Sequence, residues 1–145
     1  MIMQIIRIEY YNRQLAKDVI ETFFNQSKIE INDNFFLNKN NYLYVAIVDQ
    51  KVVGQIYGYT FDRLDTQKQQ VFIYSIDVLE AYQNQGIGKK LIEAFLNPFK
   101  MGKHRNAFVI TNELNQKAIR LYMSTGGKLV SSIEGHSVLF EWNLN

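Results

Sequence analysis

The sequence contains no cysteine and only two histidines, His104 and His136. Disulfide bonds, cysteine-based zinc sites and cysteine nucleophiles are therefore excluded, and we expect no bound metal. No apolar run approaches the roughly 18 residues that a membrane-spanning helix requires, so no membrane partner is expected. The first residues, MIMQIIRIEYYNRQ, lack the charged segment and long apolar core of a signal peptide, which favours a cytoplasmic protein.

An excess of charge of one sign is also lacking, because 16 lysines and arginines face 14 acidic residues and leave a formal net charge of +2. The basic residues form no run longer than two, so a nucleic-acid partner is not expected. Ten phenylalanines and nine tyrosines indicate a well-filled interior rather than disorder. A chain of 145 residues fits one domain, residues 1–145, with a substantial core.

The order of the apolar patterns predicts a mixed α/β fold. We expect a helix at 12–26, a helical turn within 32–41, a helix from 87 to about 96, and a helix that Asn115 opens and Gly126 and Gly127 end. We expect a sheet of about six or seven strands, with candidate strands at 2–9, 42–49, 51–61, 71–78, 107–111, 128–134 and 137–143. Residues 63–70 are interpreted as a polar connection. Only the last two helices offer crossovers, so parallel pairing should be confined to that half of a largely antiparallel sheet.

The segment DVLEAYQNQGIGKKL, residues 77–91, places Lys89 and Lys90 where the partial positive charge of a helix start disfavours cations. A phosphate-binding loop of the Walker type is excluded, because Gly88 and Lys89 are followed by a second lysine and no glycine lies five residues earlier. A dinucleotide fingerprint also fails, because Leu91 stands where the third small residue belongs and the loop is too long.

Gln83, Gly86 and Gly88 instead satisfy the pattern Gln/Arg-x-x-Gly-x-Gly/Ala, in which backbone N–H groups and a helix start face an anion. With VFIYSIDV before it and NELNQKAIRLYMSTGGKL after it, this segment resembles the GNAT superfamily of N-acetyltransferases. The resemblance in element order covers nearly all of the chain, and the specific motifs cover residues 71–129. It implies a GNAT-like sheet with flanking helices, splayed at its central strand, and acetyl-CoA as cosubstrate.

The resemblance also implies which residues bind the cosubstrate. The central strand is expected to pair its backbone with the pantetheine arm, and the loop is expected to hold the pyrophosphate. The implied binding residues are Ile76, Val78, Gln83, Asn84, Gln85, Gly86, Ile87, Gly88, Lys89 and Asn115. Asparagine is also a preferred helix N-cap, a second role that is compatible with binding.

Tyr122, in AIRLYMSTGG, matches the tyrosine that acts as general acid in the family and protonates the leaving thiolate. A buried core tyrosine is the alternative. The general base is less defined: Asp77 is the acid within the central strand and our candidate, while Glu80, Glu113, Glu141 and a water chain stay as alternatives.

The function that the resemblance implies is direct transfer of an acetyl group to a primary amine of a small molecule. The ending GG…E…SVLFEW is loosely similar to aminoglycoside 3-N-acetyltransferases, which makes an aminoglycoside one option. A protein or peptide N-acetyltransferase and a non-catalytic acyl-CoA-binding module are the alternatives. The resemblance also leaves open a homodimer in which the aromatic-rich final strand pairs across the interface.

Overall fold

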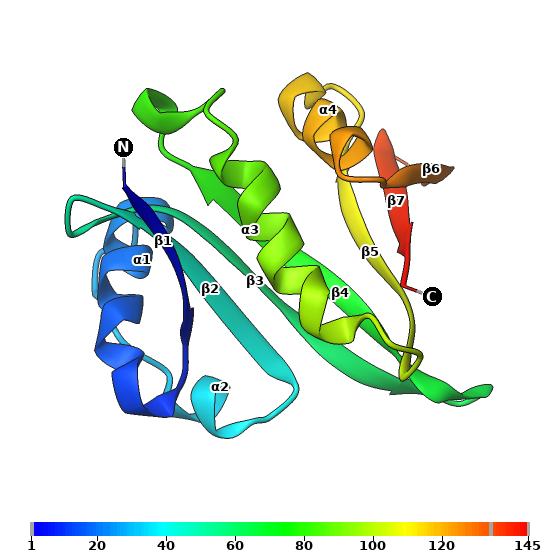
Figure 1. Ribbon diagram of the computed structural model, residues 1–145, viewed down its shortest axis with the longest axis horizontal. Helices are drawn as coiled ribbons and strands as arrows, with labels where there is room; N and C mark the ends of the chain where they lie inside the picture. The colour runs from blue at the N-terminus through cyan, green and yellow to red at the C-terminus, as the bar shows by residue number, and fades with distance from the viewer. Residues whose placement is uncertain (1, 134, 145) are drawn as a thin grey trace.

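The computed structural model describes residues 2–133 and 135–144, and residues 1, 134 and 145 lie outside the description. One seven-stranded sheet runs through these residues in the order β1-β2-β3-β4-β5-β7-β6 (Figure 1). Pairing is parallel between β4 and β5 and antiparallel elsewhere, which confirms the expected topology. The strands are β1 (Met3–Ile8), β2 (Asn41–Val48), β3 (Lys51–Arg63), β4 (Thr66–Val78), β5 (His104–Asn112), β6 (Lys128–Ile133) and β7 (Ser137–Asn143).

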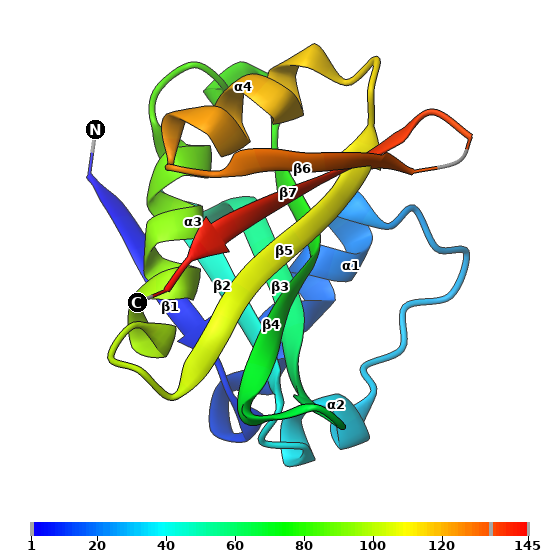
Figure 2. The same cartoon turned by 90° about the vertical axis from the view of Figure 1, so that its right-hand side faces the viewer.

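Helices cover both faces of this sheet (Figures 1 and 2). They are the α-helices α1 (Ala16–Phe23), α2 (Asp33–Leu37), α3 (Ile87–Leu96) and α4 (Gln116–Ser124), and the 3-10 helices η1 (Tyr10–Leu15), η2 (Glu80–Tyr82) and η3 (Asn97–Phe99). Helices α3 and α4 share one apolar core with the sheet, and α1 and α2 share another with the opposite face of β2 and its neighbours. Alternation along β2 explains this division, because Tyr44 and Ala46 face the first core while Leu43 and Val45 face the second.

Two predicted boundaries were wrong. Residues 63–70 are not a connection, because β3 and β4 pair as far as Arg63 and Thr66 and leave only a two-residue turn. All but Leu64 carry polar side chains, since water reaches both faces of the hairpin tip, where consecutive residues such as Gln67 and Lys68 are exposed. The helix expected at 12–26 divides into η1 and α1, because the side chain of Asn12 accepts from the backbone of Glu9 and donates to that of Arg7, which competes with helical bonding.

The final strand, β7, is not at the edge of the sheet, as pairing across a homodimer interface would require. β7 pairs with β5 on one side and β6 on the other, so it has no free edge to offer to a second copy of the chain. The predicted strand 128–134 is confirmed as β6 up to Ile133, and Glu134 lies outside the described residues. Whether the protein forms a homodimer stays a prediction.

A β-bulge interrupts the pairing of β3 with β4. Tyr57 pairs with Ser75 while the next residue, Gly58, pairs with Ile73, so Tyr74 is an extra residue on β4. Bulges of this kind bend a strand and redirect a side chain. The glycine is needed here, because a Cβ at position 58 would lie 2.0 Å from the carbonyl oxygen of Phe72.

The parallel pairing of β4 with β5 stops next to the bulge. Its last pair is Phe72 with Phe108, whereas β5 continues alongside β7 as far as Asn112. Within the described residues, the part of β4 from the bulge to Val78 therefore has no pairing partner on its β5 side. This is the splay expected at the central strand, and it leaves backbone N–H and C=O groups free for a ligand.

We predict that Gly58→Ala lowers the free energy of unfolding by about 3 kcal/mol, since the new methyl group meets a backbone carbonyl that cannot move aside. The matched control is Gly54→Ala, whose Cβ would meet the flexible side chain of Leu91 at 3.0 Å and should cost about 1 kcal/mol. Urea denaturation of both variants measures the difference. Equal losses would contradict the structural role of the bulge.

Candidate active site

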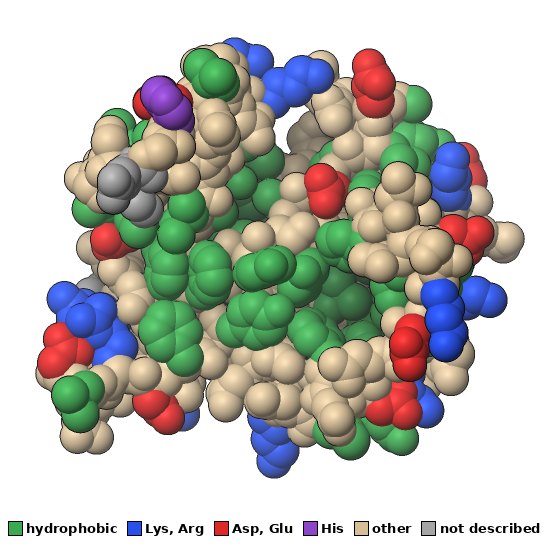
Figure 3. Space-filling model, turned by 180° about the vertical axis from the view of Figure 1, so that it is seen from behind, with side chains coloured by type: hydrophobic (Ala, Val, Ile, Leu, Met, Phe, Trp, Pro, Cys, Tyr) green, Lys and Arg blue, Asp and Glu red, His purple; other side chains and the backbone are tan. Residues whose placement is uncertain are grey.

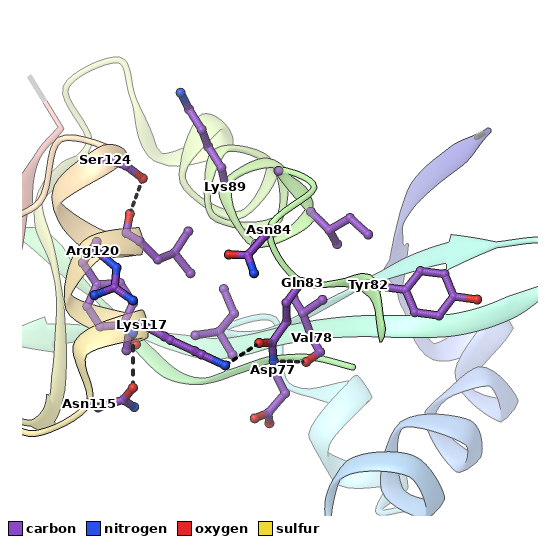
Figure 4. Close-up of a pocket in the computed structure, with 17 residues that line it drawn as sticks. Asp77, Val78, Tyr82, Gln83, Asn84, Lys89, Asn115, Lys117, Arg120 and Ser124 are labelled. Carbon is purple, nitrogen blue, oxygen red and sulfur yellow. Dashed lines mark hydrogen bonds between the residues drawn. The ribbon is translucent and has the colours of Figure 1, made fainter. Parts of the chain in front are cut away.

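A cavity of about 520 Å³ lies between the end of β4, the start of α3 and one face of α4 (Figure 4). The structure brings almost all of the predicted site residues to it. Those that line it are Ile76, Asp77, Val78, Gln83, Asn84, Gly86, Ile87, Gly88, Lys89, Asn115 and Tyr122. The exception is Gln85, whose side chain turns back along the loop and donates from Nε2 to the carbonyl oxygen of Ala81 at 3.4 Å.

The start of α3 has no side-chain cap and borders the cavity. Gly86, its N-cap, has a φ of +82°, a left-handed conformation that glycine adopts freely, and it provides no side chain to cap the helix. The first helical N–H groups therefore lack intrahelical acceptors and stay available to a ligand. Gly88 allows α4 to come close, because a Cβ there would lie 3.0 Å from the side chain of Leu121.

Helix α4 adds cations that the sequence analysis missed. Lys117 and Arg120 line the cavity together with Lys89, so three cations surround the loop. Lys117 Nζ donates to Gln83 Oε1 at 3.2 Å, and Gln83 Nε2 donates to the carbonyl oxygen of Val78 at 2.9 Å (Figure 4). Lys117 and Arg120 are three residues apart, which places both on one face of the helix that Asn115 opens. This spacing could have revealed them in the sequence.

Asp77 is the one carboxylate among the described residues that line the cavity. Gln55, fully buried on β3, donates from Nε2 to Asp77 Oδ2 at 3.0 Å and to Ser75 Oγ at 2.9 Å. Desolvation raises the pKa of the Asp77 carboxyl above its ordinary value, and the hydrogen bonds from Gln55 and Ser75 oppose that rise. The positioning residues Gln55 and Ser75 were not predicted, because their relation to Asp77 depends on strand register.

Tyr122 lies in the last turn of α4 and is 4% exposed. Its ring contacts those of Phe140 and Trp142, with centroids 5.8 and 5.6 Å apart, and its carbonyl oxygen accepts from Gly127 N at 2.8 Å where the helix ends. Burial, with a smaller contribution from the Asp77 charge, raises the pKa of the Tyr122 phenol to about 12. The hydroxyl is therefore protonated at neutral pH and can act as a hydrogen-bond donor.

The alternative bases lie elsewhere. Glu113 contacts His136 Nδ1 at 2.6 Å, Glu141 accepts from Asn106 Nδ2, and Glu80 lies in η2; the described lining of the cavity contains none of these acids. Asn115 caps α4 as expected, since its Oδ1 accepts from Ala118 N at 3.2 Å. This cap uses the oxygen, so the amide nitrogen is the group that can serve a ligand.

The family model of the acetyltransferase (GNAT) family matches residues 2–126. The chain belongs to this family. It is accordingly an acetyl-CoA-dependent N-acetyltransferase, as the splayed β4 and the glycine loop had indicated. No curated protein matches the sequence. The GNAT chain has no helix, within the described residues, that is long and apolar enough to span a membrane, and those residues hold no group of metal-ligating side chains.

Solved structures share the fold. An aminoglycoside acetyltransferase from an uncultured soil metagenomic sample, in complex with sisomicin, is 24% identical with a TM-score of 0.80, over 90% of this chain and 91% of that one. Arabidopsis thaliana NAA60 in complex with acetyl-CoA is 18% identical with a TM-score of 0.73, over 99% of both chains. A GNAT-family acetyltransferase from Streptococcus pneumoniae is 17% identical with a TM-score of 0.76, over 99% and 100%.

We predict that Gly86→Glu weakens the binding of acetyl-CoA by about 100-fold or more, because it places a negative charge at the anion-binding helix start and strains a left-handed backbone. Gly102→Glu is a matched control: this glycine also has a positive φ, +88°, and open space around it, but it lies outside the cavity lining. Isothermal titration calorimetry compares the two variants. Equal affinities would contradict the assignment of the loop.

Proposed function

We propose that this acetyltransferase transfers the acetyl group directly to a primary amine of a small molecule, within one domain formed by residues 1–145. The observation that supports this is the arrangement of the cavity. Its α3 end has exposed N–H groups and cations, and its β4 end has a carboxylate, Asp77, close enough to the Tyr122 phenol to raise its pKa. An anionic acyl donor and a cationic acceptor therefore find complementary charge at different ends of one site.

At the donor end, the N–H groups of α3 and the Lys89, Lys117 and Arg120 side chains bind the phosphates of acetyl-CoA. The unpaired backbone of β4 at Ile76 and Val78 binds the pantetheine arm, and the Asn115 amide nitrogen contributes a further donor. The carbonyl oxygen of Val78 already accepts from Gln83. A ligand that bonds this carbonyl has to displace the Gln83 side chain. The displaced side-chain amide of Gln83 can then donate to the phosphates.

At the acceptor end, the ammonium group loses one proton to solvent, and Asp77 takes the second proton from the nitrogen as the amine attacks the thioester. A primary ammonium group has a pKa of about 10.4 and cannot attack the thioester until it is neutral. Desolvation that raises the pKa of the carboxyl makes Asp77 a better base than an ordinary surface aspartate. Gln55 and Ser75 hold the carboxylate in place through their hydrogen bonds.

Tyr122 stabilises the thiolate that leaves as the amide forms. Complete proton transfer from a phenol of pKa about 12 to a thiolate whose conjugate acid has a pKa of about 8.5 costs about 5 kcal/mol. Donation of a hydrogen bond as negative charge builds on the sulfur has no such cost. The tyrosine therefore acts mainly as a hydrogen-bond donor in the transition state, and the thiolate takes its proton from solvent after release.

Tyr122→Phe is predicted to lower kcat by at least about tenfold and to leave the affinity for acetyl-CoA unchanged, because the phenyl ring keeps its packing while the donor is lost. Tyr44→Phe is the control, since Tyr44 is also buried but contacts Phe95, outside the cavity lining. Release of free CoA measures turnover. An unchanged kcat would exclude the role of Tyr122, and saturable acetyl-CoA binding without CoA release from any amine would favour a non-catalytic module.

Asp77→Asn is predicted to lower kcat by about 100-fold or more and to remove the acidic limb of the pH–rate profile. Folding raises the pKa of the Asp77 carboxyl above its ordinary value of 3.8, so the folded state disfavours the ionised form. The ionised carboxylate therefore lowers the stability of the folded protein at pH values above 3.8. The substitution should therefore leave Tm at pH 7 unchanged or higher, with no gain below pH 3.8. A variant that loses both activity and stability would indicate a structural role for Asp77.

A further inference from the structure

Three tyrosines form a compact group on the sheet face opposite α3 and α4. Tyr57 and Tyr59 lie on β3, and Tyr74 is the extra residue of the β4 bulge. The ring centroids are 5.2 Å apart for Tyr57 and Tyr74, 5.8 Å for Tyr59 and Tyr74, and 6.2 Å for Tyr57 and Tyr59. We call this group the tyrosine cluster. Tyr74 lies on the face of Phe72 by ordinary alternation, and the bulge resets the alternation so that Ser75 and Asp77 share this face as well.

The tyrosine cluster belongs to a partly exposed apolar surface that the helices cover only at its border, visible as the broad hydrophobic area in the middle of Figure 3. Phe72 and Phe108 extend it across the parallel strands, their rings stacked at 4.6 Å. At its border Phe24, the residue after α1, contacts Tyr57, and Phe35 of α2 contacts both Tyr57 and Tyr59. Tyr74 is 58% exposed. An exposed apolar surface of this extent on a folded domain typically marks a binding site.

Strand register connects the tyrosine cluster with Asp77. Tyr57 pairs with Ser75 and Gln55 pairs with Asp77, so these four side chains share the face of the sheet that carries the cluster. The carboxylate also lines the cavity beyond the splay. Burial raises the pKa of both Tyr57 and Tyr122, and the Asp77 charge adds a smaller contribution to each, which places the carboxylate near both phenols. Asp77 thus stands at the junction between the cosubstrate cavity and the tyrosine cluster.

We propose that the tyrosine cluster is the acceptor subsite, and that it selects small primary amines with a single positive charge and an apolar, above all aromatic, body. This inference rests on the proposed function. Asp77 and the negative faces of the rings attract one ammonium group, and the remaining ring surface buries the apolar body.

The charges near the cluster disfavour a polycation. Glu141 pairs with Phe108 and so shares this face, but it already accepts from Asn106. The other charges of the cavity are Lys89, Lys117 and Arg120. Among the described residues of the cluster and the cavity lining, the further ammonium groups of an aminoglycoside would therefore find like charges and no second carboxylate to pair with.

The test compares 2-phenylethylamine with ethanolamine, which present the same aminoethyl group on an aromatic or a polar body, and with sisomicin as a polycation. Each amine is measured twice, by calorimetric binding in the presence of CoA and by turnover with acetyl-CoA. We expect kcat/KM for 2-phenylethylamine to exceed that for ethanolamine by about tenfold or more, mainly through KM.

Tyr74→Ser should reduce this preference to about threefold or less and leave the KM for acetyl-CoA unchanged, because the ring is exposed and supports only the acceptor. Tyr11→Ser is the matched control, since Tyr11 is 76% exposed on η1 and is not part of the cluster. This variant should keep the wild-type preference.

The outcomes separate the two proposals. Binding of 2-phenylethylamine that depends on Tyr74, without acetyl transfer to any amine, would support the subsite and refute the proposed function. Turnover that favours ethanolamine, sisomicin or a peptide N-terminus over 2-phenylethylamine would overturn the subsite and leave acetyl transfer intact. An equal effect of Tyr74→Ser on all amines would also overturn it.

Discussion

Beyond Phe72 and Phe108, β4 and β5 stop exchanging backbone hydrogen bonds, and the rest of the site depends on that separation. Unpaired backbone groups inside a protein cost free energy, so a splayed strand persists only where another group or a ligand satisfies them. Here the Gln83 side chain bonds the carbonyl oxygen of Val78. The bulge at Tyr74, made possible by the absence of a Cβ at Gly58, sets the place where the separation begins.

The separation also organises charge. On one side of the splay, the uncapped start of α3 and the cations of α3 and α4 create a positive region. On the other side, Gln55 and Ser75 hold Asp77 next to the tyrosine cluster. Lys89 opposes the dipole of its own helix, which is unfavourable for stability and favourable for binding an anion. The raised pKa of Asp77 shows a similar balance between stability and function. Partial desolvation of the carboxylate lowers the stability of the protein and makes the carboxylate a stronger base.

Much of the fold could be predicted because its signals are local. The α3 stripe of Ile87, Leu91 and Phe95 is fully buried as the four-residue spacing indicates, and α3 ends at Leu96 as expected. The expected reason does not hold, because Asn97 keeps helical backbone angles and the chain continues through Pro98 as the 3-10 helix η3. The prediction failed where solvent reaches both faces of a strand, as at the β3–β4 tip, because such a strand carries no hydrophobic alternation. It failed again at Asn12, where a side chain bonds the backbone in place of the helix.

The sequence by itself determined the glycine loop and the helix start that follows it, since the glycines, the helix start and the lysines all lie within the fifteen residues from Asp77 to Leu91 and depend on local chain geometry. Only the tertiary structure decided which carboxylate shares the cavity with Tyr122, which cations of α4 face the loop, and which tyrosines adjoin Asp77. Gln55 and Asp77 are 22 residues apart, and Asp77 and Tyr122 lie on different elements. Such neighbours are set by strand register and by the packing of α4 against the sheet, and a one-residue slip in register would turn these side chains to the other face.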